Sequence, residues 1–163
     1  MKIGFKFCVL ILCSVGACAQ KSFDEHVSNL YEGTVPLIKS AELETLNSEH
    51  LYLLDTRNQE EFNISHLEGA RMIDYEGFRK ADVKDIPRDA KVIVYCSVGY
   101  RSERIGEKLQ KMGFTDVNNL YGGIFDWKNK GHEVLNQQGV PTDSVHTYNF
   151  LWSKWLTNGI KVY

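Results

Sequence analysis

Cys96 stands directly after a run of strand-forming residues, within the stretch VIVYCSVGYRSER (92–104). Small, turn-prone residues and Arg101 follow within five positions, and the sequence then becomes typical of a helix that begins near Ser102. Amides of such a loop can point inward, because Gly99 adopts positive φ at little cost, and the helix N-terminus adds partial positive charge. With the charge of Arg101, these features favour a thiolate. We therefore interpret Cys96 as a nucleophile rather than a buried structural cysteine, and its target is sulfur, phosphorus or carbon.

The elements that position this loop alternate between strands and helices. Continuous apolar runs predict strands buried on both faces, and apolar residues at i, i+4 and i+7 predict helices. This alternation predicts an α/β fold with a doubly wound, mostly parallel five-stranded sheet and helices on both faces. Sites in such sheets form where strand carboxyl ends meet helix N-termini, as at Cys96. The expected strands are 36–38, 51–54, 70–73, 92–95 and 117–120; the expected helices are one N-capped by Ser40 with Leu43 and Leu46, one with Ile105, Leu109 and Met112 ending at Gly113, and one with Ile124 and Trp127 ending at Gly131.

Composition limits the class of partner. The chain has 163 residues, which suits one domain with a single sizeable core. The net charge is −2 and no basic stripe with interleaved aromatic residues occurs, so we expect no nucleic-acid partner. The histidines show no metal-ligand spacing, so we expect no metal site.

Residues 1–19 are typical of a secretory signal peptide. Two lysines form a basic region, and the apolar run 7–15 is too short to span a bilayer, which needs about 20 residues. Val15-Gly16-Ala17-Cys18 resembles a bacterial lipobox, with Cys18 as the lipid-bearing residue. The alternative is plain cleavage after Ala17-Cys18-Ala19. We expect an exported protein of the periplasm or cell envelope that meets the membrane only through a lipid anchor.

Removal of this segment changes the cysteine count. Cys8 and Cys13 leave with the signal, and Cys18 is lipidated or lost, so Cys96 remains as the single thiol. It has no partner for an intramolecular disulfide, and cysteine pairs cannot bind a metal. An unpaired thiol in an exported protein favours a reactive role.

Four motifs occur in order along the chain. They are Asp55-Thr56-Arg57 with Glu61-Phe62; Phe62-x-x-x-His66-Leu67-Glu68-Gly69-Ala70; Cys96-Ser97-Val98-Gly99-Tyr100-Arg101-Ser102; and Leu120-Tyr121-Gly122-Gly123-Ile124-Phe125-Asp126-Trp127. Together they resemble the motifs of the single-domain rhodaneses, a sulfurtransferase family with a doubly wound α/β fold. We place the rhodanese-like domain at residues 33–134.

The length of the cysteine loop separates sulfur chemistry from phosphorus chemistry within this fold. Related phosphatases and arsenate reductases have a C-x5-R loop, which makes room for a tetrahedral oxyanion. Here Arg101 closes a C-x4-R loop, and Ser102 occupies the place that the phosphatase arginine needs. The resemblance therefore favours sulfur.

The resemblance implies a double displacement without a metal or organic cofactor. Cys96 takes the outer sulfur of a small donor such as thiosulfate, becomes a persulfide, and passes the sulfur to a thiol or cyanide. Thiosulfate-preferring members often carry a basic residue after the cysteine, and this chain has Ser97 there. The implied substrate-binding residues are Ser97, Val98, Gly99, Tyr100, Arg101 and Ser102.

Four further residues are expected to support the site rather than to contact substrate. Asp55 and Arg57 would brace the fold, through hydrogen bonds and an ion pair with Glu60 or Glu61. We interpret His66 as a hydrogen-bonded structural histidine.

Residues 135–163 lie beyond the resemblance. A helix after Asn149 would place Leu151, Trp152, Trp155 and Leu156 on one face that packs against the domain. The alternative is that this aromatic-rich extension forms a docking surface or a lid over the site.

The sequence thus predicts an exported sulfurtransferase with a Cys96 persulfide. The alternatives are a non-catalytic rhodanese-fold module that binds a partner or carries sulfur, and an enzyme like the phosphatases or arsenate reductases. The protein partner and the physiological donor and acceptor are left open.

Overall fold

The structure is a computed structural model that describes residues 23–47 and 50–163. The predicted signal peptide, its lipobox and Cys18 lie outside these residues.

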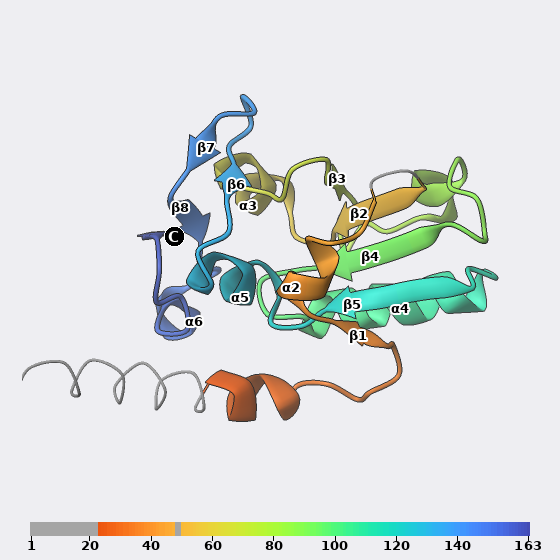
Figure 1. Ribbon diagram of the computed structural model, residues 1–163, viewed down its shortest axis with the longest axis horizontal. Coiled ribbons are helices and arrows are strands. Elements are labelled where there is room, and N and C mark those ends of the chain that lie inside the picture. Colours follow the sequence, from red (N-terminus) through yellow and green to blue (C-terminus); the bar gives the residue numbers. More distant parts are fainter. Residues whose placement is uncertain (1–22, 48–49) are drawn as a thin grey trace, which may run out of the picture.

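Five parallel strands form the central sheet, in the order β1-β5-β4-β2-β3. Neighbouring strands are hydrogen-bonded in register, with Asp55 level with Tyr95 and Val94 level with Asn119. The expected five-stranded sheet is confirmed (Figure 1). The strands are β1 (Leu37–Ile38), β2 (Leu51–Asp55), β3 (Arg71–Met72), β4 (Lys91–Tyr95) and β5 (Asp116–Leu120).

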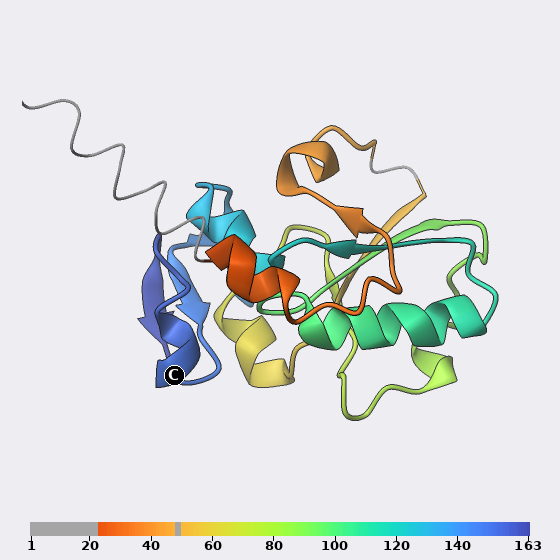
Figure 2. The same ribbon diagram turned by 90° about the horizontal axis from the view of Figure 1, so that it is seen from below.

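The central strand β4 supplies side chains to two hydrophobic cores. Ile93 and Tyr95 point into one core, and Val92 and Val94 point into the other, because successive strand residues face opposite sides. Both sides of the sheet are therefore covered by helices, with α4 against one face and α2 against the other (Figure 2). The helices are α2 (Ser40–Leu43), α3 (Gln59–Ile64), the 3-10 helix η1 (Lys80–Val83), α4 (Tyr100–Lys111), α5 (Gly123–Asn129) and α6 (Phe150–Ser153), and residues 23–28 are also helical.

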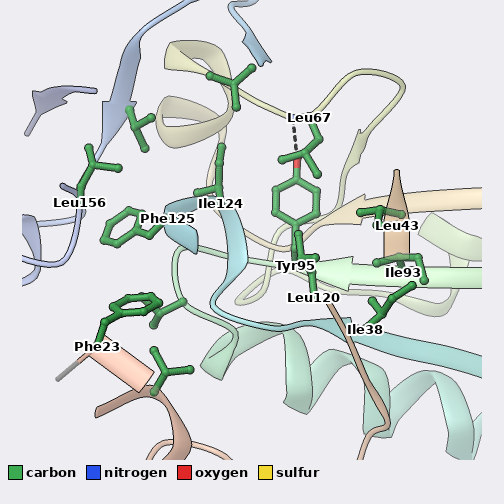
Figure 3. Packing of buried hydrophobic residues seen from close by; sticks show 14 residues of the cluster. Phe23, Ile38, Leu43, Leu67, Ile93, Tyr95, Leu120, Ile124, Phe125 and Leu156 are labelled. Atoms are coloured by element: carbon green, nitrogen blue, oxygen red, sulfur yellow. Dashed lines mark hydrogen bonds between the residues drawn. The ribbon is translucent and has the colours of Figure 1, made fainter. Parts of the chain in front are cut away.

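The core that contains Tyr95 extends to the carboxyl edge of the sheet (Figure 3). The Tyr95 hydroxyl accepts a hydrogen bond of 3.1 Å from the Leu67 amide, so a buried polar group is satisfied inside an apolar cluster. Ile124 and Phe125 of α5 are fully buried in the same cluster. This packing fixes the start of α5 close to the end of β4.

Two helix starts differ from the sequence prediction. Ser40 is the first residue of α2 rather than its N-cap; the N-cap is Lys39, which provides no side-chain cap. Helix α4 begins at Tyr100, two residues before Ser102, because Gly99 takes the N-cap position with φ of 102°. The loop that contains Cys96, between the end of β4 and the start of α4, is therefore shorter than the sequence indicated.

The residues after α5 pack partly on the domain and partly face solvent. Val145 and Leu156 are fully buried in the Tyr95 core, and the Trp155 ring lies 6.0 Å from that of Phe23. The expectation that Leu151 shares their packed face is wrong, because α6 has only four residues and Leu151 is 75% exposed. The elements of this part are β6 (Val134–Leu135) antiparallel to β7 (Pro141–Thr142), and β8 (Ser144–His146) parallel to β9 (Ile160–Val162).

Candidate active site

Cys96 directly follows β4 and is buried at the carboxyl edge of the sheet. The Gly99 amide donates a hydrogen bond to Sγ at 3.1 Å. Positive φ at Gly99 lets the chain turn back on the sulfur within three residues and then enter α4, which an L residue would do only with strain. The loop therefore aims backbone N–H groups at the thiol.

The pKa of the Cys96 thiol is lowered below its ordinary value. Burial alone raises this pKa, because it disfavours the charged form, but the charge of Arg101 and the amides of Ser102 and Val98 outweigh it. A guanidinium and helix N-terminal amides are the groups that stabilise reactive thiolates. Cys96 is thus a thiolate, and hence a nucleophile, at a lower pH than an ordinary cysteine.

Arg101 is fixed beside the thiol by a buried carboxylate. Its Nη1 and Nη2 donate to Glu61 Oε2 and Oε1, each at 2.8 Å. The Ser97 hydroxyl joins the pair, because Oγ donates to Glu61 Oε1 at 3.1 Å and accepts from Arg101 Nη2 at 3.0 Å. This bidentate geometry holds the guanidinium in one orientation. The predicted contact residue Ser97 therefore turns its hydroxyl to Glu61 and Arg101.

Glu61 is held in turn by the start of α3. Asn58 Oδ1 accepts from the Glu61 amide at 2.8 Å, and Glu61 Oε2 accepts from the Asn58 amide at 3.2 Å, which forms a capping box. Burial alone raises the pKa of Glu61, but the hydrogen bonds and charge of Arg101 outweigh it, so this pKa is lowered. The carboxylate therefore stays ionised and neutralises Arg101.

The predicted ion pair of Arg57 with Glu60 or Glu61 is wrong. Arg57 pairs with Asp55 at 2.6 Å, and both side chains are fully buried. Arg57 Nη2 also donates to the Ser65 carbonyl at 2.6 Å. Arg57 pairs with Asp55 because the Asp55 carboxylate lies at the end of β2, beside the guanidinium. Glu61 is bound to Arg101 instead.

His66 lies among structural contacts. Its Nδ1 is 3.0 Å from the Phe62 carbonyl, and its ring stacks on that of Phe62 at 4.0 Å between centroids. Its backbone exchanges two hydrogen bonds with Leu135. His66 thus ties the end of α3 to β6.

Asn119 links the loop to β5, and the sequence prediction missed it. Its Nδ2 donates to the Gly99 carbonyl at 2.9 Å, while its Oδ1 accepts from the Ser102 hydroxyl at 2.7 Å. The Ser102 hydroxyl therefore lies between Asn119 and the thiol, and both the amide and the hydroxyl of Ser102 help to lower the pKa of Cys96. Asn119 is one of two adjacent asparagines in a predicted strand, and the structure buries it, where a polar group needs partners.

Gly122, the N-cap of α5, and Gly123, its first residue, let the N-terminus of this helix approach the cysteine loop closely. The amides of Ile124 and Phe125 donate to the carbonyls of Cys96 and Ser97 at 2.9 and 3.1 Å. A Cβ on Gly123 would collide with the Cys96 carbonyl oxygen. The loop carbonyls are thereby turned away from the sulfur, which leaves the amides facing it.

Tyr31 also holds the loop, and no pattern around it pointed to this role. Its hydroxyl donates to the Val98 carbonyl at 2.7 Å and accepts from the Gly122 amide at 2.9 Å. Burial raises the pKa of Tyr31 well above its usual value, so the donor proton is retained. One hydroxyl therefore joins the cysteine loop to the start of α5.

A cavity of about 530 Å³ opens at the thiol. Tyr148 and Trp152 reach it from the chain after α5, and the guanidinium carbon of Arg101 is 5.5 Å from the Tyr148 ring centroid. Tyr100 is 42% exposed at the mouth. The lining residues are Leu30, Asn58, Asp74, Tyr75, Glu76, Cys96, Ser97, Val98, Tyr100, Arg101, Tyr148 and Trp152.

Within 23–47 and 50–163, no group of three or more His, Cys, Asp or Glu side chains has the arrangement of a metal site. In the same ranges, no helix combines the length and apolar character needed to cross a membrane.

Residues 40–130 match the sequence profile of the rhodanese-like domain. The chain belongs to this family. A solved rhodanese-related protein from Thermoplasma volcanium is 28% identical, with a TM-score of 0.55 over 61% of this chain and 97% of that one. A rhodanese-like domain protein from Staphylococcus aureus is 23% identical, with a TM-score of 0.55 over 63% and 98% of the two chains. The second likeness is one of fold.

Curated relatives are longer proteins. The tRNA uridine(34) hydroxylase of Listeria monocytogenes is 36% identical over 108 residues, which are 63% of this chain and 34% of that protein. That of Streptococcus pyogenes is 40% identical over 86 residues, 50% of this chain and 26% of that protein. This chain thus spans about a third or less of their length. Tyr31, Tyr148 and Trp152 lie outside the segment that matches the rhodanese-like profile.

Proposed function

We propose that the protein is a sulfurtransferase that carries sulfane sulfur as a persulfide on Cys96. The observation that carries this proposal is the hydrogen bond of 3.1 Å from Gly99 N–H to Sγ, inside a loop that Arg101 closes after four residues. The family to which the chain belongs supports the same chemistry.

The first half-reaction transfers a sulfur atom without net oxidation. The Cys96 thiolate attacks the outer sulfur of thiosulfate, a new S–S bond forms at Sγ, and the old S–S bond breaks so that sulfite leaves with the electron pair. The charges balance, because thiolate and thiosulfate carry three negative charges and so do the deprotonated persulfide and sulfite. The loop amides stabilise the anion on the outer sulfur, as preorganised donors do.

The dimensions of the loop argue against phosphoryl transfer. Gly99 N–H already contacts Sγ, and α4 begins at the next residue, so the amides converge close to the sulfur. A phosphoryl group needs donors around three equatorial oxygens beyond the nucleophile. The short loop suits one persulfide sulfur better.

The hydroxylase activity named for the curated relatives is not proposed for this chain. The chain covers about a third or less of those proteins. Asp74 and Glu76 line the cavity, and these carboxylates would repel the phosphates of a nucleic acid.

Intact-mass spectrometry after exposure to thiosulfate tests the proposal. We expect the purified protein to gain the mass of one sulfur atom, and to lose it on addition of cyanide or a reducing thiol. Cys96→Ser should gain nothing, because the serine hydroxyl stays protonated and is a poor nucleophile toward sulfur. Hydrolysis of a small aryl phosphate by the wild type, with no persulfide on Cys96, would overturn the proposal.

We also propose that the protein works outside the cytoplasm, anchored by a lipid on Cys18, as residues 1–19 suggest. Metabolic labelling with a tritiated fatty acid should label the wild type in the membrane fraction and leave Cys18→Ser unlabelled. Equal labelling of both, or an uncleaved protein in the cytosol, would contradict this location.

A further inference from the structure

The charge and size of the cavity point to a substrate class for the proposed sulfurtransferase. The cavity measures about 530 Å³, within the range of sites for drug-sized molecules. Thiosulfate and cyanide have only a few atoms and would leave most of this space empty. One substrate is therefore an organic molecule.

The walls of the cavity are largely aromatic. Tyr75, Tyr100, Tyr148 and Trp152 contribute rings, and Leu30 adds an aliphatic side chain. Such walls bind an apolar carbon body, and the faces of aromatic rings also attract cations.

Two carboxylates give the lining a negative charge. Asp74 and Glu76 are exposed in the loop after β3, and across the part of the chain that is described neither forms an ion pair. The Glu76 amide donates to Asp74 Oδ1 at 3.3 Å, which ties the two residues together in one turn. At this part of the wall, away from Arg101 and the thiol, an anionic organic acceptor is disfavoured and a cationic one is favoured.

Arg101, the cation in the lining, does not cancel the negative charge of Asp74 and Glu76. Among the described residues that line the cavity, Arg101 is the one permanent cation, and Glu61 neutralises it through two hydrogen bonds of 2.8 Å. The guanidinium also lies near the Tyr148 ring. Arg101 can thus stabilise charge on the sulfur atoms. Two further cations pack on lining rings, Arg104 at 3.8 Å from the Tyr100 centroid and Lys108 at 5.5 Å from that of Tyr75, but neither lines the cavity, and Arg104 is paired with Glu32 and Glu103. The unpaired charges among the described lining residues are therefore those of Asp74 and Glu76.

We propose that the acceptor of the Cys96 sulfur is an organic thiol that bears a positive charge on an apolar body, with Asp74 and Glu76 as its specificity-determining residues. This inference rests on the proposed persulfide chemistry. The anionic persulfide left by the first half-reaction takes up a proton from water on its outer sulfur, and the acceptor thiolate then attacks that sulfur. A new S–S bond forms to the acceptor, the bond to Sγ breaks, and Cys96 leaves as a thiolate while the proton stays on the outer sulfur.

A single-turnover experiment with matched acceptors tests the inference. Persulfidated protein, freed of donor, is mixed with 2-aminoethanethiol, 2-mercaptoethanol or 3-mercaptopropionate, and loss of the extra sulfur is followed by intact mass. Rates are compared at equal thiolate concentration, so that differences in thiol pKa do not enter. We expect the cationic thiol to exceed the anionic one about tenfold, as two partly solvated carboxylates near a unit charge allow. Added salt should reduce this ratio.

Variants assign the effect to the two carboxylates. Asp74→Asn and Glu76→Gln should each lower the cation-to-anion ratio, and the double variant should bring it close to one. Asp74→Asn keeps the oxygen that accepts from the Glu76 amide, so the turn is preserved. Asp89→Asn is the charge-matched control, because Asp89 is exposed in the turn before β4, about one strand length from Cys96. This control should leave the ratio unchanged.

A second pair of acceptors separates a small-molecule source from a protein source. Short peptides with a cysteine between two lysines or between two glutamates are compared with 2-aminoethanethiol, and the basic peptide should exceed the acidic one. If 2-aminoethanethiol reacts faster than the basic peptide, the acceptor is a small molecule; if the basic peptide reacts faster, the acceptor is a cysteine of a protein. Equal rates for the cationic and anionic acceptors of both pairs, or an unchanged ratio in the double variant, would overturn the inference. Absence of any persulfide on the wild type would instead overturn the proposed function.

Discussion

The hydroxyl of Tyr31 donates a hydrogen bond of 2.7 Å to the carbonyl of Val98, the residue two positions after Cys96. The same oxygen accepts from the Gly122 amide at 2.9 Å. A side chain ahead of the first strand thus couples the cysteine loop to the start of α5, and it turns the Val98 carbonyl away from the sulfur. We therefore expect the reactivity of Cys96 to depend on this contact, because it helps to orient the loop amides.

Removal of the Tyr31 hydroxyl should slow sulfur transfer without unfolding the protein. Tyr31→Phe leaves the buried Val98 carbonyl and Gly122 amide without their partner, which costs about 1–3 kcal/mol. We expect slower persulfide formation from thiosulfate in stopped-flow experiments and a higher thiol pKa. The control is Tyr121→Phe, which loses a hydroxyl bonded to Asp24 at 2.9 Å and does not contact the loop. Equal rates for Tyr31→Phe and wild type would show that Tyr31 does not position the loop.

The pH dependence of Cys96 alkylation should report the charge of Arg101. Because the guanidinium lowers the pKa of the thiol, iodoacetamide should react with the wild type at a pH below that needed for an ordinary cysteine. In Arg101→Ala the midpoint should move to higher pH, because the charge that opposes burial is gone. Lys91→Ala, which removes a cation that pairs with Asp116 at the other end of β4, is the control and should leave the midpoint in place. A midpoint in Arg101→Ala at or below that of the wild type would contradict this account.

Arg101→Ala should also reverse the pH dependence of stability that arises from Glu61. In the wild type the folded-state pKa of Glu61 is lowered, so its contribution is present above the unfolded-state pKa and is lost as pH falls through the folded value. Without Arg101, burial is opposed by the charge of Arg57 and the Asn58 amide, whose effects are smaller. We therefore expect the pKa of this carboxyl to rise above its unfolded-state value, so that stability is lost as pH rises through the raised value.

Thermal unfolding followed by circular dichroism from pH 3 to 8 measures this change. We expect the difference in Tm between Arg101→Ala and wild type to grow as pH rises, with the variant the less stable. Near neutrality the free energy of unfolding of the variant should be lower by about 3–5 kcal/mol, because Glu61 is left buried without its partner charge. Arg101→Ala with Glu61→Gln should recover part of the loss, because the stranded charge is gone. A constant difference in Tm across this range would refute the assignment.

Gly123→Ala should reduce persulfide formation on Cys96 more than an alanine substitution at another glycine with positive φ. Gly123 has φ of 54°, and its Cβ would strike the backbone of Cys96 and Ser97. The control Gly131→Ala has φ of 88° and meets nothing within 4 Å. Both variants should lose about 1 kcal/mol from backbone strain, and Gly123→Ala should in addition lose most of its persulfide formation. Similar activity in the two variants would show that close approach of α5 is not required.

The sequence by itself determined the order of the elements and the place of the nucleophile. The apolar run before Cys96 and the glycine after it are local signals, and a strand followed by a tight turn into a helix puts the thiol at the sheet edge in any fold of this class. The apolar residues of β4 alternate between two cores for the same local reason, since strand side chains have a period of two.

Only the tertiary structure decided which polar groups pair. Arg57 has carboxylates within reach at Asp55, Glu60 and Glu61, and sequence spacing alone favoured the wrong ones. The choice depends on Glu61 being turned by its capping box toward Arg101, forty residues along the chain. A side-chain pair forms where packing brings two groups within about 3 Å, and sequence spacing does not encode that distance.

The same limit applies to residues that reach the site from outside the family segment. Tyr31 and Tyr148 precede and follow that segment, and nothing in their neighbours marks them as loop contacts. In the sequence, Asp74 and Glu76 have no feature that distinguishes them from other surface carboxylates. The structure shows that the loop after β3 places them on the wall of the cavity. Local sequence therefore specified the thiol and its loop, whereas long-range packing specified the groups that hold the loop and the charge of the cavity around it.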